Sequence, residues 1–414
     1  MLFHTACSYV SSKIKILEFE YNALAIAILC FCPPLSLEPL SPTKVKKASS
    51  IFLITLDNLD ALITCINFFL LIIFSFNSNS QIYDPVSWQF SKNKIDNKRY
   101  ELIFTANIDD KLVAITPAMS EGSGMVEFSE QHPDKFFDVA IAEQHCVNVA
   151  AGMACEGLKP VVAIYSTFLQ RAFDQVVHDV AIQKLPVRFA IDRAGLVGSD
   201  GPTHAGSFDI TYLATLPNFI VMAPSNQREL SNMIELSCEI NDTPSAFRFP
   251  RGTGSDELFN NQPTDINIGK GYILIEGNDV AILNLGTRLE KCIEASKFLN
   301  QNNIYPTIAD ARFAKPLDTE LIDNLLNNHK YILTIEEGSI GGFSSHVLHY
   351  VHNIRSKKDN VVIKNLIFPD RFVEHMTPDE QYQDIKMDTE SIIRKINNFY
   401  ENKIFDIKNF KSKV

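Results

Sequence analysis

The sequence has no excess of basic residues. Its 414 residues include 38 Lys and Arg against 49 Asp and Glu, which gives a formal net charge of −11. Neutralising the phosphates of a nucleic acid requires clustered Lys and Arg. The charge therefore argues against a protein that binds nucleic acid through a broad basic face, and we expect no nucleic-acid partner.

The sequence also lacks a CxxC motif and any histidine cluster at the spacing of metal ligands, although it has eight cysteines. In a chain of this length, scattered cysteines are typical of small buried side chains in a reducing compartment. We therefore expect no zinc site and assign no metal ligand to this chain.

No apolar run reaches the roughly 20 residues that a membrane-spanning helix needs. The runs at 23–32 and 61–76 lie in a segment, residues 1–80, whose five Lys balance five Asp and Glu. The segment has no basic cluster before an apolar core, as a secretory signal would, and its acidic residues disfavour an organelle-targeting peptide. A membrane anchor through 61–76, a targeting segment and a stretch without a defined role remain open.

Overall composition predicts a soluble globular protein with more than one domain. Hydrophobic residues make up 46% and charged residues 21%, which excludes wholesale disorder, collagen and coiled coil. At roughly 100 to 200 residues per domain, the length predicts two or three domains.

From Leu112 onward, short apolar runs alternate with helical stretches, which is typical of a mostly parallel sheet covered by helices. The expected strands are LVAIT, FFDVAIAE, VVAIYS, PVRFAID, FIVMAPS and SAFRFPR, followed by VAILNLG, YPTIADAR, YILTIEE and VVIKNLIF. The expected helices are 143–157, 167–184, 287–301, 318–328 and 388–400. The predicted fold class is α/β.

A stretch rich in Gly, Asp and Asn divides this pattern. We predict an apolar N-terminal segment at 1–80, an α/β domain at 82–252, a linker at 253–278 and a second α/β domain at 279–400. Ligands of such folds bind beyond the carboxyl ends of the strands, so residues that follow strands are the candidates for a site.

Glu143 is one such candidate, because it ends the apolar run FFDVAIA and opens the next helix. An acidic residue in a first helical turn is favoured by the helix dipole alone. A partly buried carboxylate that hydrogen-bonds a ligand nitrogen is the functional alternative. Position in the sequence does not decide between them.

The loop after PVRFAID is rich in glycine and polar residues, which is common at functional sites. His204 in this loop is either solvated or a proton donor and acceptor. Arg193 and Arg251 each follow a strand and are either solvated or form a fork for phosphate or carboxylate.

Several runs together resemble the 1-deoxy-D-xylulose-5-phosphate synthases, which are transketolase-like thiamin diphosphate enzymes. In the first half these are DVAIAEQH (138–145), YSTFLQRAFDQ (165–175), DRAGLVGSDGPTHAGSFDITYL (192–213), APSN (223–226) and FPRG (249–252). In the second half they are ADARFAKPLD (309–318), TIEEGSIGGF (334–343) and FPDRFVEH (368–375). The resemblance covers residues 82–395, the pyrimidine-binding and C-terminal transketolase-like domains. It departs at position 173, where Phe replaces the usual Tyr.

The resemblance implies thiamin diphosphate and Mg²⁺ as cofactors, and pyruvate and glyceraldehyde 3-phosphate as substrates. It implies that Glu143 bonds N1′ of the aminopyrimidine, as a catalytic residue, and that Phe168 stacks on this ring. For the substrates, it implies that Tyr165, Arg193 and Arg251 hold the aldehyde's phosphate. It further implies that Arg171, Asp200 and His204 line the reacting carbonyls, with His204 exchanging a proton.

The resemblance does not extend to the family's first domain. In the family, a Gly-Asp-Gly motif and a later Asn of that domain hold Mg²⁺ and the diphosphate. No Gly-Asp-Gly occurs in the sequence. We therefore expect a partial chain whose Mg²⁺ ligands lie on an absent domain or another chain. The alternatives are the β subunit of a two-chain 2-oxo acid dehydrogenase and a non-catalytic remnant.

The same resemblance implies a homodimer or a complementing chain that contains the Gly-Asp-Gly motif. We expect a cytoplasmic protein, with a plastid location or membrane anchoring through 61–76 as alternatives.

Overall fold

The structure is a computed structural model that describes residues 106–107, 109–252, 262–354 and 361–400. The segment predicted at 1–80, with its apolar run at 61–76, lies outside the described residues. Among the residues that are described, no helix has the length and apolar character needed to cross a membrane.

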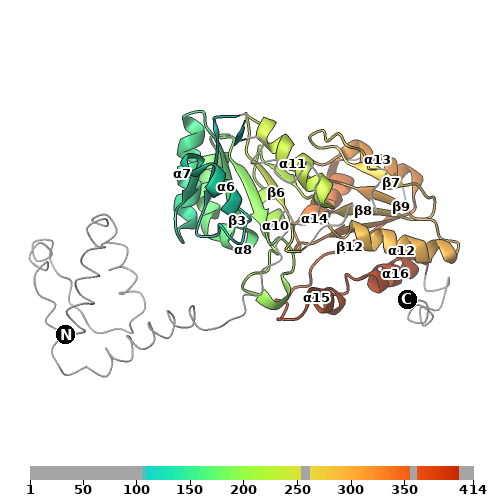
Figure 1. The fold of residues 1–414 in the computed structure, drawn as a ribbon. Helices are drawn as coiled ribbons and strands as arrows, with labels where there is room; N and C mark the ends of the chain where they lie inside the picture. The colour runs from blue at the N-terminus through green and yellow to red at the C-terminus, as the bar shows by residue number, and fades with distance from the viewer. Residues whose placement is uncertain (1–105, 108, 253–261, 355–360, 401–414) are drawn as a thin grey trace, which may run out of the picture. The chain divides into compact units, whose positions relative to one another are not determined.

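A seven-stranded sheet forms the first half of the described chain (Figure 1). Its strands lie in the order β10-β5-β6-β4-β3-β1-β2, and all neighbours are parallel except β10 and β5. The strands are β1 (Leu112–Thr116), β2 (Phe136–Asp138), β3 (Lys159–Tyr165), β4 (Arg188–Asp192), β5 (Ile220–Met222), β6 (Ser245–Arg248) and β10 (Phe313–Lys315). The interior strands β1, β3 and β4 are covered on both faces, which is why they are continuous apolar runs.

The helices of this half are α6 (Val126–Gln131), α7 (Glu143–Cys155), α8 (Ser166–Leu169), α9 (Phe173–Gln175), α10 (Asp209–Ala214) and α11 (Gln227–Glu239). The 3₁₀ turns are η3 (Pro133–Lys135), η4 (Gln170–Ala172) and η6 (Gly198–Asp200), and η5 (Val176–Ala181) is a π-helix. The single helix expected at 167–184 is thus divided into α8, η4, α9 and η5.

A second sheet of five strands has the order β12-β11-β8-β9-β7, with only β7 antiparallel to its neighbour. The strands are β7 (Tyr272–Ile275), β8 (Ala281–Leu285), β9 (Thr307–Asp310), β11 (Tyr331–Glu336) and β12 (Val362–Leu366). β7 lies inside the range 253–278, so the end of the predicted linker is a strand. It pairs with β9 and closes one edge of the sheet.

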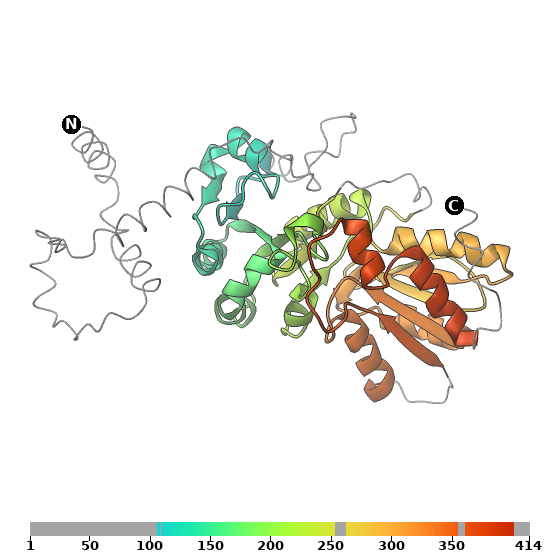
Figure 2. The same cartoon turned by 90° about the horizontal axis from the view of Figure 1, so that it is seen from below.

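Helices cover both faces of this second sheet (Figure 2). They are α12 (Leu289–Gln301), α13 (Thr319–Asn328), α14 (Phe343–His349), α15 (Pro378–Asp384) and α16 (Thr389–Asn397), with the π-helix η7 (Tyr350–Ile354) and the 3₁₀ turn η8 (Asn398–Tyr400). Ile282 of β8 packs with α12 and α16, whereas its neighbours Ala281 and Leu283 pack with α13 and α14. The alternation of side chains along the strand produces these two layers.

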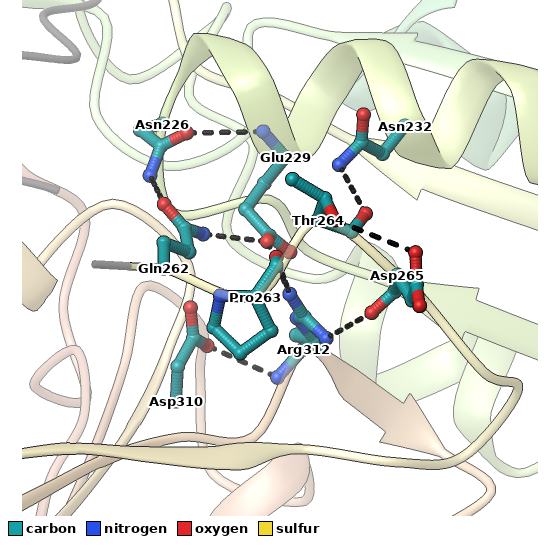
Figure 3. Close-up of polar contacts among 9 residues, drawn as sticks. All are labelled: Asn226, Glu229, Asn232, Gln262, Pro263, Thr264, Asp265, Asp310 and Arg312. Atoms are coloured by element: carbon teal, nitrogen blue, oxygen red, sulfur yellow. Dashed lines mark hydrogen bonds and ion pairs between the residues drawn. The ribbon is translucent and has the colours of Figure 1, made fainter. Parts of the chain in front are cut away.

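The two halves of the described chain also contact each other. β10 follows β9 of the second sheet but pairs with β5 of the first. Beside it, Arg312 Nη2 lies 2.6 Å from Glu229 Oε1 of α11, and both side chains are buried (Figure 3). Gln262 Nε2 donates to the same carboxylate at 2.5 Å. Removing one partner of a buried ion pair leaves the other charge buried and unpaired, which is destabilising. This cluster therefore fixes the second half of the described chain on the first.

The strand before Glu143 is shorter than the sequence analysis expects. β2 ends at Asp138, and Glu143 begins α7 after a turn with a positive φ of 58° at Ala140. β2 is an edge strand, and Phe137 on it is exposed. The apolar run 136–142 therefore divides between an edge strand and a turn.

Candidate functional site

The predicted site residues lie at or beyond the carboxyl ends of β2, β3, β4 and β6. β3 and β4 are parallel neighbours, and Tyr165 at the end of β3 is paired in register with Asp192 at the end of β4. The segments that follow these strands therefore leave the sheet at one edge. This is where an α/β sheet places its ligands.

Glu143 opens α7 with its side chain facing inward, and only 3% of the residue is exposed. Its Oε1 pairs with Nη1 of Arg171, whose side chain is about half exposed. The guanidinium carbon of Arg171 lies 5.0 Å from the centroid of the Phe168 ring. Arg171 thus joins the buried carboxylate to the aromatic ring.

Phe168 also contacts Tyr165 and His204. Its ring centroid lies 5.7 Å from that of Tyr165 in a stacked arrangement, and 5.4 Å from that of His204 edge to face. His204 Nδ1 lies 2.9 Å from Thr203 Oγ1, which orients the imidazole. We call Glu143, Arg171, Phe168, Tyr165 and His204 the aromatic group.

Arg193 faces inward rather than into an open fork. Its guanidinium carbon lies 3.7 Å from the centroid of the Tyr165 ring, and only 3% of the residue is exposed. Nη1 donates to Gly122 O at 2.9 Å and to Asp192 Oδ2 at 2.8 Å. Burial raises the pKa of Asp192 to about 7, an effect that Arg193 opposes.

Arg251 is the more accessible of the two arginines. Its Nη1 lies 2.7 Å from Asp200 Oδ2, and both side chains are partly exposed. Burial raises the pKa of Tyr165 to about 12, and the charges of Arg193, Asp192, Asp200 and Arg251 also act on this phenol. The structure therefore gathers Tyr165, Asp200 and both arginines into one region.

Two contributors to this region are missing from the sequence prediction. A Cβ at Gly122 would lie 1.6 Å from the Tyr165 hydroxyl oxygen, so only glycine fits where the loop after β1 crosses this side chain. Asp192 accepts from the backbone N of Arg193 at 2.6 Å, and Arg193 has a positive φ of 56°. The only sequence signals for Gly122 and Asp192 are the Gly-Ser-Gly in a loop after a strand and the position of Asp192 directly before Arg193.

The glycines of the long loop hold its base together. Gly195 and Gly206 exchange backbone hydrogen bonds of 2.8 and 2.7 Å. A Cβ at Gly206 would lie 2.3 Å from Arg193 O, so the two arms of the loop approach too closely for a side chain. This pairing brings the segment with His204 back toward Phe168.

The arrangement fits one end of a thiamin cofactor. A buried carboxylate close to an aromatic ring suits an aminopyrimidine, which offers ring nitrogens and a flat face. Within residues 106–107, 109–252, 262–354 and 361–400, no group of three or more His, Cys, Asp or Glu could hold a metal ion. The residues described thus suit the pyrimidine end of the cofactor and supply no cluster for the metal of its diphosphate end.

Two domains of one enzyme family match this chain. Residues 101–255 match the pyrimidine-binding domain of transketolase, and residues 269–392 match the transketolase C-terminal domain. The chain belongs to the transketolase family through these two domains.

Within that family, the chain is similar to a rice protein (Oryza sativa subsp. japonica) described as probable 1-deoxy-D-xylulose-5-phosphate synthase 2, chloroplastic. The two are 48% identical over 310 residues, which make up 73% of this chain and 44% of the rice protein. The chain thus spans less than half the length of this relative. The resemblance inferred from the sequence is confirmed.

Solved structures share the fold. A chain described as a split gene transketolase, inactive beta4 tetramer, superposes with a TM-score of 0.64 at 27% identity, covering 72% of this chain and 95% of that chain. A transketolase from Campylobacter jejuni gives a TM-score of 0.60 at 15% identity, covering 73% of this chain and 46% of that chain. The predicted α/β class with two transketolase-like parts is confirmed.

Proposed function

We propose that this chain supplies the pyrimidine-binding and C-terminal parts of a 1-deoxy-D-xylulose-5-phosphate synthase. The enzyme would join a two-carbon unit from pyruvate to glyceraldehyde 3-phosphate and so supply a precursor of isoprenoids, thiamin and pyridoxal phosphate. The similarity to the rice protein supports the reaction. The observation that carries the proposal is the aromatic group, which connects Glu143 through Arg171 and Phe168 to His204.

Thiamin diphosphate, when bound, supplies the carbon nucleophile that decarboxylation and transfer require. On this chain Glu143 would hold the pyrimidine nitrogen N1′, and Phe168 would offer its ring to the flat face. Arg171 balances the charge of Glu143 in the chain as described, so the carboxylate is not left buried and unpaired. Ligands for the diphosphate and Mg²⁺ would come from a domain that carries the Gly-Asp-Gly motif, which these 414 residues do not contain.

The substrate side of the proposal rests on charge and exposure. Arg251 offers a partly exposed guanidinium, which suits the phosphate of the aldehyde, and Asp200 holds it in place. Arg193 would act indirectly, by holding the Tyr165 ring in place. His204 would give a proton to, or take one from, the substrate oxygen.

The proposal includes a complementing partner. The chain covers 95% of a split gene transketolase chain, a chain that its description calls inactive as a beta4 tetramer, and this supports an assembly with a second chain or domain. The description of the rice relative as chloroplastic supports the plastid alternative for the location.

The experiment mixes purified chain with a separately expressed domain that carries the Gly-Asp-Gly motif of a 1-deoxy-D-xylulose-5-phosphate synthase. We expect formation of the product from pyruvate and glyceraldehyde 3-phosphate in the mixture and none with either component alone. Turnover by the chain alone would contradict the shared site. If no such domain yields product although both components fold, the non-catalytic alternative is favoured.

A further inference from the structure

A helix of the second half holds the tip of the loop that carries Asp200 and His204. Gln381 of α15 is 1% exposed, and its amide bonds the backbone of Gly198 in both directions. Gly198 N donates to Gln381 Oε1 at 2.7 Å, and Gln381 Nε2 donates to Gly198 O at 3.1 Å. Nε2 also donates to Glu374 O at 2.8 Å, so a buried amide is saturated by main-chain groups.

Gly198 in turn directs the chain toward His204. Gly201 N donates to Gly198 O at 3.1 Å, and His204 N donates to Gly201 O at 3.2 Å. Two successive main-chain hydrogen bonds thus lead from the residue that Gln381 holds to His204. A Cβ at Gly201 would lie 2.3 Å from the ring of His375, so the segment before α15 packs closely on the same tip.

The base of the loop is held by hydrogen bonds that do not involve Gln381. Ala194 N donates to Phe249 O at 3.0 Å, and Gly195 and Gly206 bond each other. Loss of the Gln381 contacts should therefore loosen residues 198–204 and leave the base in place.

We propose that Gln381 is a positioning residue, which fixes segment 198–204 so that Asp200 holds Arg251 and His204 faces Phe168. The proposal rests on the proposed function only in assigning these side chains to the substrate. The sequence offers a matched control in Gln383, which is exposed on the same helix.

The first test uses the full chain alone and measures amide hydrogen exchange in Gln381→Met, Gln383→Met and the natural sequence. Two net hydrogen bonds of about 1 kcal/mol each predict exchange at 198–204 that is faster by roughly tenfold or more in Gln381→Met. Exchange at 194–195 and 206 should stay unchanged, and Gln383→Met should match the natural chain. Unchanged exchange at 198–204 in folded Gln381→Met overturns the proposal.

A second variant covers the case in which Gln381→Met does not fold. Gln381→Glu keeps the acceptor for Gly198 N but cannot donate to Gly198 O when ionised, so the same peptide should exchange faster. Loss of folded protein in both variants would also overturn the proposal, since Gln381 would then hold the whole fold.

The functional arm uses the mixture with the Gly-Asp-Gly domain. Gln381→Met should raise KM for the phosphorylated aldehyde about tenfold through Arg251, with KM for pyruvate changed less than about twofold. Equal changes in both KM values would show a general loss of structure. An inactive natural mixture would contradict the proposed function, whereas the exchange result would still decide whether Gln381 positions the tip.

Discussion

Arg193 lies against Tyr165, with its guanidinium carbon 3.7 Å from the centroid of the phenol ring. The same guanidinium donates to Gly122 O at 2.9 Å, so one side chain ties the ends of β3 and β4 to the loop after β1. Arg193 therefore forms part of the wall of the candidate site. Arg251, partly exposed beside Asp200, is the arginine to which the proposed function assigns the phosphate.

Replacing Arg251 by Ala should therefore affect one substrate selectively. A charge-assisted hydrogen bond contributes roughly 1.5 to 3 kcal/mol, so KM for glyceraldehyde 3-phosphate should rise about tenfold or more in the active mixture. KM for pyruvate should barely change, because pyruvate carries no phosphate. Arg394→Ala, on the exposed face of α16, serves as the control. Equal increases for both substrates would remove Arg251 from the phosphate site.

Replacing Arg193 by Met should instead reduce stability. The change leaves the carboxylate of Asp192 buried without its 2.8 Å partner. Above about pH 7, where Asp192 is ionised, removing one member of this buried ion pair should cost about 3 to 5 kcal/mol. Urea unfolding of the chain alone should show this loss, with Arg394→Met close to the natural chain. A fully stable Arg193→Met chain with a raised aldehyde KM would restore the expected arginine fork.

The sequence pattern predicted the strands well where burial on both faces makes them continuous apolar runs. LVAIT coincides with β1, and YILTIEE contains β11. β10 could not be predicted in this way. Its three residues are too few for an apolar pattern, and its partner strand β5 lies far away in the sequence. Such pairing depends on tertiary contacts rather than on local propensity.

The site was predictable in its location but only partly in its contacts. Parallel strands bring residues after β3 and β4 to one edge, as the sequence indicates. The inward turn of Arg193 depends on its positive φ of 56°, which its residue type does not signal. Likewise, Gly122 becomes part of the site only because Tyr165 points at it. Roles within the site remain predictions.

Glu143→Gln should abolish turnover in the active mixture and leave the fold intact. The amide keeps the shape of the side chain but removes the charge that would hold the pyrimidine nitrogen. Because its partner Arg171 is half exposed, the stability loss should stay at about 1 kcal/mol or below. Glu130→Gln, on the exposed side of α6, provides the matched control. Full activity of the Glu143→Gln mixture would exclude thiamin chemistry at this residue.

Cutting the chain between its two halves should not separate them. A protease site inserted within residues 253–261 allows cleavage at the start of the predicted linker. β10 would then remain paired with β5, and Arg312 with Glu229, so the fragments should elute together in gel filtration. Arg312→Met should lower the urea concentration at which they part. Elution as two separate species would show that the halves are independent domains.

The buried cluster around Glu229 also makes stability depend on pH. It holds the carboxylate of Glu229 against the guanidinium of Arg312, and the carboxylate of Asp310 against the backbone N–H of Arg312 (Figure 3). Burial, reinforced by the charge of Glu229, raises the pKa of Asp310 from 3.8 to about 7. Burial raises the pKa of Glu229 as well, against the effect of Arg312. The burial of two neighbouring carboxylates thus favours retention of a proton in the folded chain.

Between about pH 4 and 7, folded Asp310 keeps a proton that the unfolded chain releases, so the free energy of unfolding should fall as the pH rises and level off above pH 7. One such group contributes a slope of at most about 1.4 kcal/mol per pH unit. Asp310→Asn should remove this contribution, and Glu229→Gln should move it to lower pH, in urea unfolding measured across this range. Asp242→Asn, exposed and outside the cluster, shows what any Asp→Asn change brings. If Asp310→Asn follows the natural chain at every pH, Asp310 is ionised throughout, and Arg312 outweighs its burial.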